Sequence, residues 1–236
     1  MKVVVIRTLF QMRSPWQARL IFLDTPDLRV CRATAADGGT CRRLYREIGR
    51  EHLWVSRERW SAEDFAAHAS RPDLGVWIAR LRGEPVGLLE VKRTVEGYGE
   101  IALLGVTPAH QGRGIGKHLL SCGIREAWRL GVAEVRVHTR SCDGEGAAAN
   151  YLRRGFTPLK RRPEIVSLPP SREAEARAYL RRARERGHGP GVLLWTAAHL
   201  RESAFCEALR QRVHAFRQRL QCALSPASYA TYPIAR

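Results

Sequence analysis

The sequence has very little lysine for a chain that is so basic. Of its 40 basic residues four are lysine and the remaining 36 are arginine, against 23 acidic residues, which leaves a formal net charge of +17. Arginine spread along the whole chain, together with abundant alanine, is what GC-rich coding produces without any selection for binding. The charge therefore does not make nucleic acid the main partner, although the same field favours any acidic ligand, a coenzyme included.

The sequence also lacks a C-x-x-C pair and any long apolar run. Its six cysteines are widely scattered, so they suggest neither a zinc site nor a disulfide framework, and we expect no metal ion. No segment approaches the roughly 20 apolar residues of a membrane helix, and the run Val3–Ile6 is too short for the apolar core of a signal peptide. We therefore expect a cytoplasmic protein that has no membrane partner.

What the chain does have is enough apolar sequence for one substantial core. It contains 236 residues, of which 44% are hydrophobic and 27% charged, as in globular proteins. Met1–Phe10 has the pattern of a short strand, but Arg13–Trp16 interrupts it, so residues 1–27 are interpreted as a loose N-terminal extension. We place the main domain at residues 28–162 and a basic, partly helical extension at 163–236.

Within the main domain, hydrophobic periodicity predicts a mixed α/β fold. Leu28–Ala33 alternates apolar and polar residues, as a half-buried strand does, and Ser61 with Asp64 has the spacing of a helix capping box. A strand, a helix and a further strand follow one another between residues 101 and 138, so those two strands should be parallel. The expected elements are, in order, a strand at 28–33, helices at 40–48 and 61–68, strands at 75–81, 85–91 and 100–106, a helix at 115–131, a strand at 133–138, a helix at 147–154 and a strand from 156.

The C-terminal extension carries weaker signals. A stretch rich in Arg, Glu and Ala predicts a helix at Ser171–Arg186, and Val192–Trp195 predicts a short strand that we expect to complete the sheet. Apolar residues recur at helical spacing from Cys206 to Leu220, which predicts a basic amphipathic helix. That helix is expected to dock on the main domain, with a small dimer seam as the alternative, so a homodimer stays open.

A glycine-rich turn between a strand and a helix is the most informative feature of the main domain. The apolar strand Ile101–Val106 leads through Thr107–Pro108 into Gln111–Gly116, and a helix is expected to begin at Ile115. Glycines let an anion approach the backbone, and the N–H groups and positive dipole end of a helix N-terminus attract it. Arg113 adds a positive charge. An ordinary tight connection is the alternative for such a turn taken alone.

A second motif later in the chain narrows the interpretation. Gln111–Gly116 contains Q-x-x-G-x-G at the start of one helix, and Tyr151–Phe156 contains Y-x-x-x-G-F at the end of another. This pairing resembles the GNAT superfamily, the Gcn5-related N-acetyltransferases, which carry Q/R-x-x-G-x-G/A as an acyl-coenzyme A signature and Y-x-x-x-G-F in a later helix. The resemblance covers the chain from about Leu28 to Leu159 and implies the GNAT fold, with its mixed sheet.

A closer similarity is to a bacterial branch of this superfamily. That branch has E-I-A in a strand, H-T at the end of the next strand, and D-x-x-x-A-x-x-N-Y before the G-F. The corresponding residues are Glu100–Ala102, His138–Thr139, Asp143, Ala147 and Asn150–Tyr151. Many members carry an asparagine where this chain has Asp143–Gly144, so the coenzyme contact of that asparagine is not transferred.

The resemblance implies acetyl-coenzyme A as the co-substrate. In GNAT folds the strands that correspond to Ile101–Val106 and Val135–His138 splay apart, and the gap admits the pantetheine arm of the coenzyme. The pyrophosphate is implied to lie on the glycine-rich turn, as anions do at helix N-termini. The implied cofactor-binding residues are Leu104, Gly105, Val106, Gln111, Gly112, Arg113, Gly114, Ile115, Gly116 and Lys117.

The resemblance also implies direct attack of an amine on the thioester, without an acyl-enzyme. Tyr151 occupies the position of an acid near the coenzyme sulfur. We expect Glu100 to be the base, with His138 as the second choice because its titration range suits proton transfer. A packing tyrosine, a surface carboxylate and a structural histidine are the corresponding alternatives. Cys142 lies near these residues, but no paired base is evident to activate it.

The function that follows is acetyl-CoA-dependent N-acetyltransfer to a primary amine of a small molecule or a protein. Two alternatives stay open: a non-catalytic module that binds or senses acyl-CoA, and an RNA- or nucleoid-associated acyltransferase that uses the arginine-rich surface. Trp54 and Trp60 are interpreted as core residues, with a wall of the substrate pocket as the alternative. The acceptor itself is not specified, because pocket walls in such folds come from loops that the pattern does not place.

Overall fold

A computed structural model describes residues 1–144, 146–185 and 194–195 of this chain. The chain divides into two compact units, Lys2–Leu194 and a second unit formed mainly by residues 195–236. The expected amphipathic helix at Cys206–Leu220 lies outside the described residues. The first unit contains the sheet, the helices and the candidate site.

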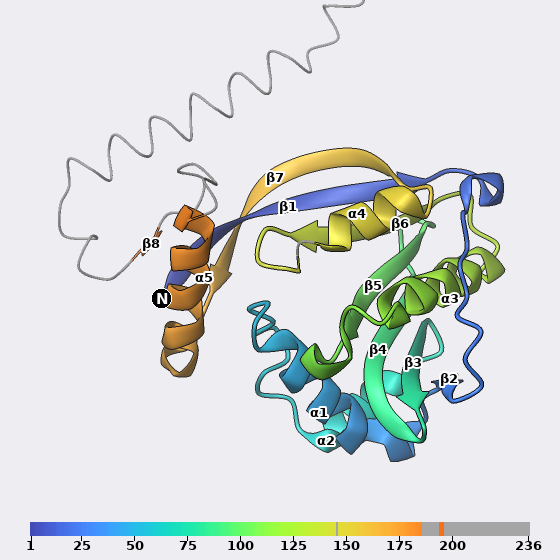
Figure 1. Ribbon diagram of the computed structural model, residues 1–236, viewed down its shortest axis with the longest axis horizontal. Coiled ribbons are helices and arrows are strands. Elements are labelled where there is room, and N and C mark those ends of the chain that lie inside the picture. Colours follow the sequence, from blue (N-terminus) through green and yellow to red (C-terminus); the bar gives the residue numbers. More distant parts are fainter. Residues whose placement is uncertain (145, 186–193, 196–236) are drawn as a thin grey trace, which may run out of the picture. The chain divides into compact units, whose positions relative to one another are not determined.

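The unit Lys2–Leu194 is built on one mixed sheet whose main path runs β2-β3-β4-β5-β6-β1-β7 (Figure 1). Neighbouring strands on this path are antiparallel except β5 and β6, which are parallel, as the strand–helix–strand pattern predicts. A two-residue strand, β8 (Leu194–Trp195), falls at the boundary between the two units. The other strands are β1 (Lys2–Met12), β2 (Leu28–Arg32), β3 (Leu74–Leu81), β4 (Glu84–Arg93), β5 (Gly99–Val106), β6 (Val135–Arg140) and β7 (Thr157–Ser167).

The helix ends follow local signals in the sequence. Ser61 caps α2 in a capping box with Asp64, as predicted. α3 begins at Ile115 as predicted, and the chain leaves it through Gly131, whose φ of +67° is readily adopted by glycine. The helix expected from Thr40 begins two residues earlier. The helices are α1 (Gly38–Gly49), α2 (Ala62–Ala69), α3 (Ile115–Arg129), α4 (Gly146–Arg153) and α5 (Glu173–Glu185). Within the described part of the chain, no helix is long and apolar enough to cross a membrane.

β1 is part of the sheet rather than a loose extension. It lies between β6 and β7 and pairs with both of them, and its residues Val3, Val5 and Met12 are buried. Arg13–Trp16 follows the last residue of the strand, so this polar stretch ends β1 instead of breaking it. The expected domain start at residue 28 therefore leaves out a strand that the sheet contains.

β7 is also longer than the sequence pattern indicates. A strand is expected from Phe156, with Pro163–Pro170 as a linker or strand-bearing loop, whereas β7 continues to Ser167 alongside β1 (Figure 1). Two prolines, Pro158 and Pro163, lie within it. β7 is at the end of the main strand path, and an edge strand tolerates proline because one side of its backbone needs no ladder hydrogen bonds.

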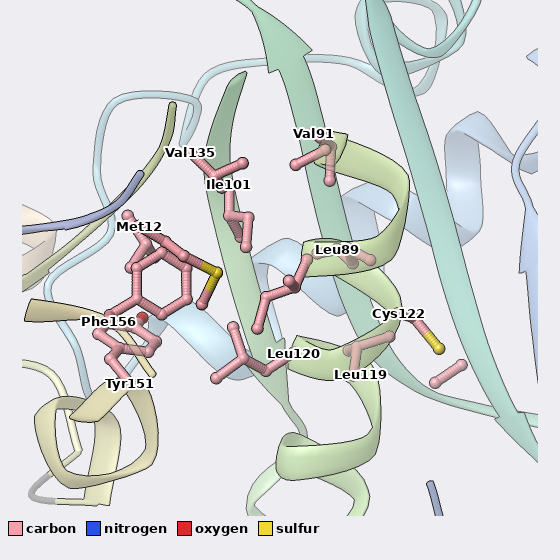
Figure 2. Packing of buried hydrophobic residues seen from close by; sticks show 14 of the residues in the cluster. Met12, Leu89, Val91, Ile101, Leu119, Leu120, Cys122, Val135, Tyr151 and Phe156 are labelled. Atoms are coloured by element: carbon pink, nitrogen blue, oxygen red, sulfur yellow. The ribbon is translucent and has the colours of Figure 1, made fainter. Parts of the chain in front are cut away.

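The core has one apolar layer on each face of the sheet. On one face, Leu119 and Leu120 of α3 pack against Leu89 of β4, and Tyr151 lies in the same layer (Figure 2). On the other face, Leu88 packs with the buried residues of α1 and α2. Successive residues of β4 thus face opposite layers, as the pleat of a strand requires. Each of these leucines contributes about 1.5–3 kcal/mol through burial.

Candidate active site

β5 and β6 separate part-way along the sheet. Their parallel pairing comprises three residue pairs, of which the last is Ile101 with Val137. β5 nevertheless continues to Val106, and β6 continues to Arg140. Between the described residues of these two strands, the edge of β5 beyond Ile101 is therefore not paired with β6. Backbone N–H and C=O groups at such an edge are available to an extended ligand.

The glycine-rich turn connects the end of β5 to the start of α3. Gly112 and Gly114 have φ values of +76° and +82°, which glycine adopts without strain. Gly114 is the N-cap residue of α3, and no side chain caps the helix. The first N–H groups of α3 also lack intrahelical acceptors, so they can donate to an anion. A Cβ atom at Gly116 would meet only Val106 Cγ2, at 3.9 Å, so the turn borders open space at this position.

A cavity of about 560 Å³ extends from this turn along β5. Six of the implied cofactor-binding residues line it, namely Leu104, Gly105, Val106, Gln111, Gly112 and Gly116. Arg113, Gly114, Ile115 and Lys117 do not line it, and Ile115 is instead buried in the core. The three catalytic candidates, Glu100, His138 and Tyr151, all line the same cavity. The tertiary structure thus brings together residues that are far apart in the sequence.

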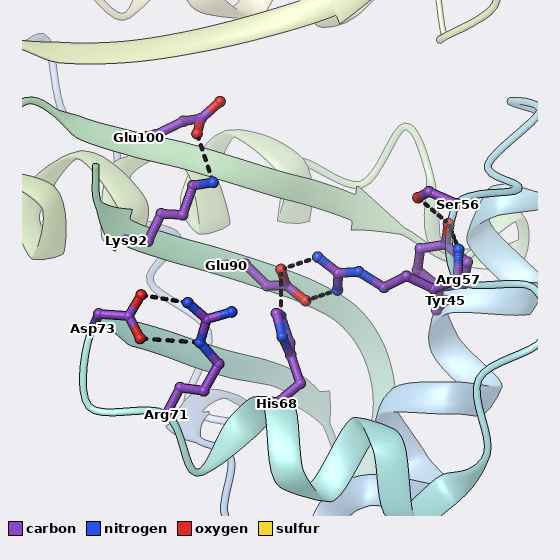
Figure 3. Close-up of polar contacts among 9 residues, drawn as sticks. All are labelled: Tyr45, Ser56, Arg57, His68, Arg71, Asp73, Glu90, Lys92 and Glu100. Carbon is purple, nitrogen blue, oxygen red and sulfur yellow. Dashed lines mark hydrogen bonds and ion pairs between the residues drawn. The ribbon is translucent and has the colours of Figure 1, made fainter. Parts of the chain in front are cut away.

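Glu100 of β5 is held between two cationic or titratable side chains. Lys92 Nζ lies 3.1 Å from Glu100 Oε2 (Figure 3), and His138 Nδ1 lies 3.7 Å from Glu100 Oε1. The pKa of Glu100 is lowered to about 2; the contact with His138 is the largest cause, and Lys92 adds to it against the opposing effect of burial. A carboxylate with so low a pKa is a weak base. The assignment of Glu100 as the base stays a prediction.

His138 of β6 also contacts β1. Arg7 Nη2 lies 3.2 Å from His138 Nδ1. His138 Nδ1 thus lies between a guanidinium group, which can only donate hydrogen bonds, and the Glu100 carboxylate, which can only accept them.

Tyr151 of α4 is buried beside His138. Its O–H group donates to the backbone C=O of His138 over 3.4 Å. Burial, and to a lesser extent the charge of Asp143, raises the pKa of Tyr151 well above its usual value, so the hydroxyl keeps its proton at neutral pH. The ring also packs edge-on against Phe10 and Phe156. A packing role and a proton-donor role are thus compatible in one side chain.

Cys142 is close to the cavity, but its thiol is not activated. Its Sγ donates to the backbone C=O of His52 over 3.3 Å. Burial and the nearby Asp143 raise the pKa of Cys142 to about 12, so the nucleophilic thiolate is scarce at neutral pH. Acyl-cysteine chemistry is therefore disfavoured on structural as well as sequence grounds. Among the residues that the structure describes, no three or more His, Cys, Asp or Glu side chains form a potential metal site.

Asp143 has structural partners in the loop after β6. Its Oδ2 accepts from the backbone N–H of Arg140 at 2.6 Å and from the hydroxyl of Thr139 at 2.9 Å. Trp54 Nε1 approaches Oδ1 at 3.5 Å, and Trp54 lines the cavity, whereas Trp60 does not. Of the two tryptophans considered from sequence, Trp54 therefore contributes to a pocket wall.

A buried carboxylate, Glu90 of β4, supports the wall on the α1 and α2 side (Figure 3). Arg57 donates to both of its oxygens, and His68 Nε2 lies 3.3 Å from Oε2. Burial has the largest influence and would raise the pKa of Glu90, but His68 and Arg57 together outweigh it and lower the pKa. Arg57 also lies over the ring of Trp60. The guanidinium group of Arg57, a residue of the cavity lining, is thus held by Glu90 and by the ring of Trp60.

Arg172 contacts the end of α1, next to residues of the cavity lining. It precedes α5 and donates to the carbonyls of Gly49 and Arg50, at 3.4 and 2.6 Å, where α1 ends. Cations near a helix C-terminus stabilise its free carbonyls. The cavity residues His52 and Trp54 follow directly in the chain. A residue of the C-terminal third therefore positions part of the cavity.

Several cationic residues of the cavity were not identified from sequence. Arg7, Arg57, Lys92 and Arg140 all line it, but with 36 arginines in the chain no composition signal distinguishes them. For Arg140, however, its position in the sequence did indicate a place near the site. It is two residues after His138 in a strand, and such residues point to the same face of a sheet.

Comparison with known proteins agrees with this arrangement. A model of the acetyltransferase (GNAT) family matches residues 41–156. The N-alpha-acetyltransferase RimI of Mycobacterium tuberculosis is 32% identical over 149 residues, which are 61% of this chain and 89% of that protein. A mycothiol acetyltransferase of Thermomonospora curvata is 29% identical over 167 residues, 64% of this chain and 52% of that protein. The chain thus spans about half the length of this relative.

A solved structure shows the same fold. The GCN5-related N-acetyltransferase of Kribbella flavida aligns with a TM-score of 0.51 and 17% identity, over 73% of this chain and 62% of that one. The cavity lies along an unpaired strand edge and reaches the N-terminus of a helix, so it suits a ligand with an extended arm and an anionic head. The match to most of RimI and the family model make the assignment definite: the chain belongs to the acetyltransferase (GNAT) family. This confirms the resemblance seen in the motifs.

Proposed function

We propose that this protein transfers the acetyl group of acetyl-CoA to a primary amine of a small molecule or a protein by direct attack on the thioester. The observation that carries the proposal is the cavity in which the glycine-rich turn, the unpaired edge of β5 and the cluster of Glu100, His138 and Tyr151 meet. The relationship to RimI supports the same reaction.

Coenzyme binding would use the turn and the strand edge. The N–H groups at the start of α3 can donate to the pyrophosphate, and Arg113 adds positive charge. The unpaired backbone groups at Leu104–Val106 can pair with the amides of the pantetheine arm. The open space beside Gly116 is consistent with a phosphate close to the backbone. This placement directs the thioester toward Tyr151.

The transfer step assigns a separate role to each polar residue. The amine nitrogen attacks the thioester carbonyl carbon, the C–S bond breaks, and the departing sulfur takes the proton of the Tyr151 hydroxyl. The proton that the amine loses goes to His138, and the ionised Glu100 stabilises the resulting imidazolium. Proton exchange with solvent then restores neutral His138 and Tyr151. The products are an acetamide and the free thiol of coenzyme A.

Thiol release from acetyl-CoA, measured across a panel of small amines and peptides, tests this proposal. We expect amine-dependent thiol release by the wild type and a loss of roughly a hundredfold or more in kcat for His138→Gln. Arg136→Gln is the matched control, because Arg136 lies on the same face of β6 but is held by Glu134 at 2.7 Å and does not line the cavity. Coenzyme binding without thiol release from any amine would instead favour a non-catalytic acyl-CoA-binding module.

A further inference from the structure

The cationic side chains of the cavity are not all matched by carboxylates. Arg57 is paired with Glu90, and Lys92 lies 3.1 Å from Glu100. Asp143, the other carboxylate of the lining, accepts hydrogen bonds from a backbone N–H and a hydroxyl. The two remaining cations of the lining are arginines on β1 and β6, and they share one carboxylate on β7. Among the described residues, these two are therefore the cations of the lining that do not each have a carboxylate partner.

The two arginines that share this carboxylate are Arg7 and Arg140. These residues are directly opposite each other on β1 and β6, and Arg162 is opposite Arg7 on β7, so the three side chains share one face of the sheet. Glu164 Oε1 accepts from Arg140 Nη2 at 2.8 Å, while Glu164 Oε2 lies 3.8 Å from Arg7 Nη1. The Nε–H groups of Arg7 and Arg140 have no hydrogen-bond partner among the described residues. Three adjacent like charges with one carboxylate are unfavourable without a further anion.

The electrostatic environment of Arg7 agrees with the presence of three arginines around one carboxylate. Burial is the largest influence and lowers the pKa of the Arg7 guanidinium, and Arg140 and Arg162 lower it further, against the opposing effects of Glu164 and Glu100. The surroundings thus disfavour the positive charge of Arg7. An anion bound to Arg7 would relieve this effect.

We propose that Arg7 and Arg140 bind a carboxylate of the acceptor, so that the preferred acceptor is an amino acid or a similar amine with a nearby carboxylate. This inference rests on the proposed acetyltransferase function. A carboxylate would supply a second counter-charge for the two arginines that share Glu164, and its two oxygens match the fork of a guanidinium group. Arg7 Nη2 lies 3.2 Å from His138 Nδ1, so a carboxylate on Arg7 places an amine one carbon away beside the proposed proton acceptor.

The position of the cluster also suits a role in substrate choice. His138 and Arg140 lie within residues 41–156, which the family model matches, whereas Arg7 and Glu164 lie outside them. The subsite thus joins residues of the family domain to two strands that flank it. Variation in flanking strands can change the acceptor without changing the transfer step.

Matched pairs of acceptors test the proposal. Each pair consists of an amino acid and its carboxamide, compared by thiol release at the plateau of each pH profile. We expect kcat/KM to be about tenfold to a hundredfold higher for the acid, as for hydrogen bonds to a charged group. Arg140→Gln should abolish this preference by raising KM for the acid alone. Arg7→Gln should also abolish the preference, and it should change kcat for both members of a pair because Arg7 contacts His138. Arg140→Lys should keep part of it, and Arg136→Gln should keep all of it.

Two results would overturn the subsite: equal kcat/KM for acid and carboxamide in the wild type, or an unchanged preference in both glutamine variants. Failure of the proposed function gives a different result, namely no acetylation of either member of any pair. In that case, calorimetric titration with the amino acids in the presence of coenzyme A tests the carboxylate subsite on its own. Weaker binding to Arg140→Gln than to Arg136→Gln would support the carboxylate subsite, and equal binding to the two variants would exclude it.

Discussion

The Glu100 carboxylate of β5 lies 3.7 Å from the His138 ring of β6. His138 is the first residue of β6 beyond the paired segment, so this contact is at the point where the two strands separate. It links two strands that line the cavity and keeps a negative charge beside the group that we propose accepts a proton. The same contact is the largest cause of the low pKa of Glu100.

We expect Glu100→Gln to change the pH dependence of stability. In the folded chain the pKa of Glu100 is lowered from 4.5 to about 2. Its ionised form therefore stabilises the fold above about pH 4.5, and this contribution is lost as the pH falls toward about 2; it amounts to about 3 kcal/mol at most. In urea unfolding, the stability gap between wild type and variant should narrow between about pH 6 and pH 3. A gap that stays constant over this range would contradict the lowered pKa.

Tyr151→Phe should lower kcat by roughly a hundredfold while leaving the KM for acetyl-CoA near that of the wild type. The ring keeps its packing against Phe10 and Phe156, and the hydrogen bond that is lost is long, at 3.4 Å. We therefore expect a loss of stability below about 1 kcal/mol. Steady-state kinetics measure kcat and KM, and thermal unfolding measures the loss of stability. An unchanged kcat across the pH range would exclude Tyr151 as the acid.

Substitutions at Gly116 test the coenzyme site. Gly116→Ala should bind coenzyme A within a few-fold of the wild type, because the added Cβ meets only Val106 Cγ2 at 3.9 Å. Gly116→Glu should fold, since an acidic residue suits the first turn of a helix, but its charge should repel the pyrophosphate and weaken binding by roughly a hundredfold. Calorimetric titration compares the two variants. Similar affinities in both would show that the pyrophosphate lies elsewhere.

Glu90→Gln should be among the more destabilising changes in this wall. It removes the counter-charge of Arg57 at a site where Glu90 is 1% exposed, which costs about 3–5 kcal/mol. Glu47→Gln is the control, because the Arg43–Glu47 pair on α1 is exposed and contributes about 0–1 kcal/mol. Denaturant unfolding measures both. Comparable losses in the two variants would contradict the structural role of the buried pair.

The cysteines should differ sharply in reactivity. Cys31 is exposed, whereas Cys142 is buried and has a pKa of about 12. Iodoacetamide near pH 8 should therefore label Cys31 readily in the native protein and Cys142 only after unfolding, as peptide mass spectrometry would show. Cys142→Ala should retain amine-dependent thiol release. Detection of an acetyl group on Cys142 during turnover would argue against direct transfer.

Local sequence signals predicted much of the fold because their causes are local. The capping box of Ser61 and Asp64, the start of α3 at Ile115 and the glycine after its end depend on neighbouring residues alone. The parallel arrangement of β5 and β6 follows from the chirality of a strand–helix–strand unit. The motifs around Gly114 and Tyr151 were sufficient to indicate the GNAT family, which the comparisons confirm.

The sequence by itself therefore determined the family and most of the elements of the main domain. Only the tertiary structure placed β1 inside the sheet, where it sets Arg7 opposite Arg140 and next to His138. It also placed Glu100 in contact with His138 and Lys92, which lower the pKa of Glu100. These relationships join residues that are distant along the chain. Such contacts leave no local pattern, because strand order and side-chain burial, rather than spacing, decide which charges meet.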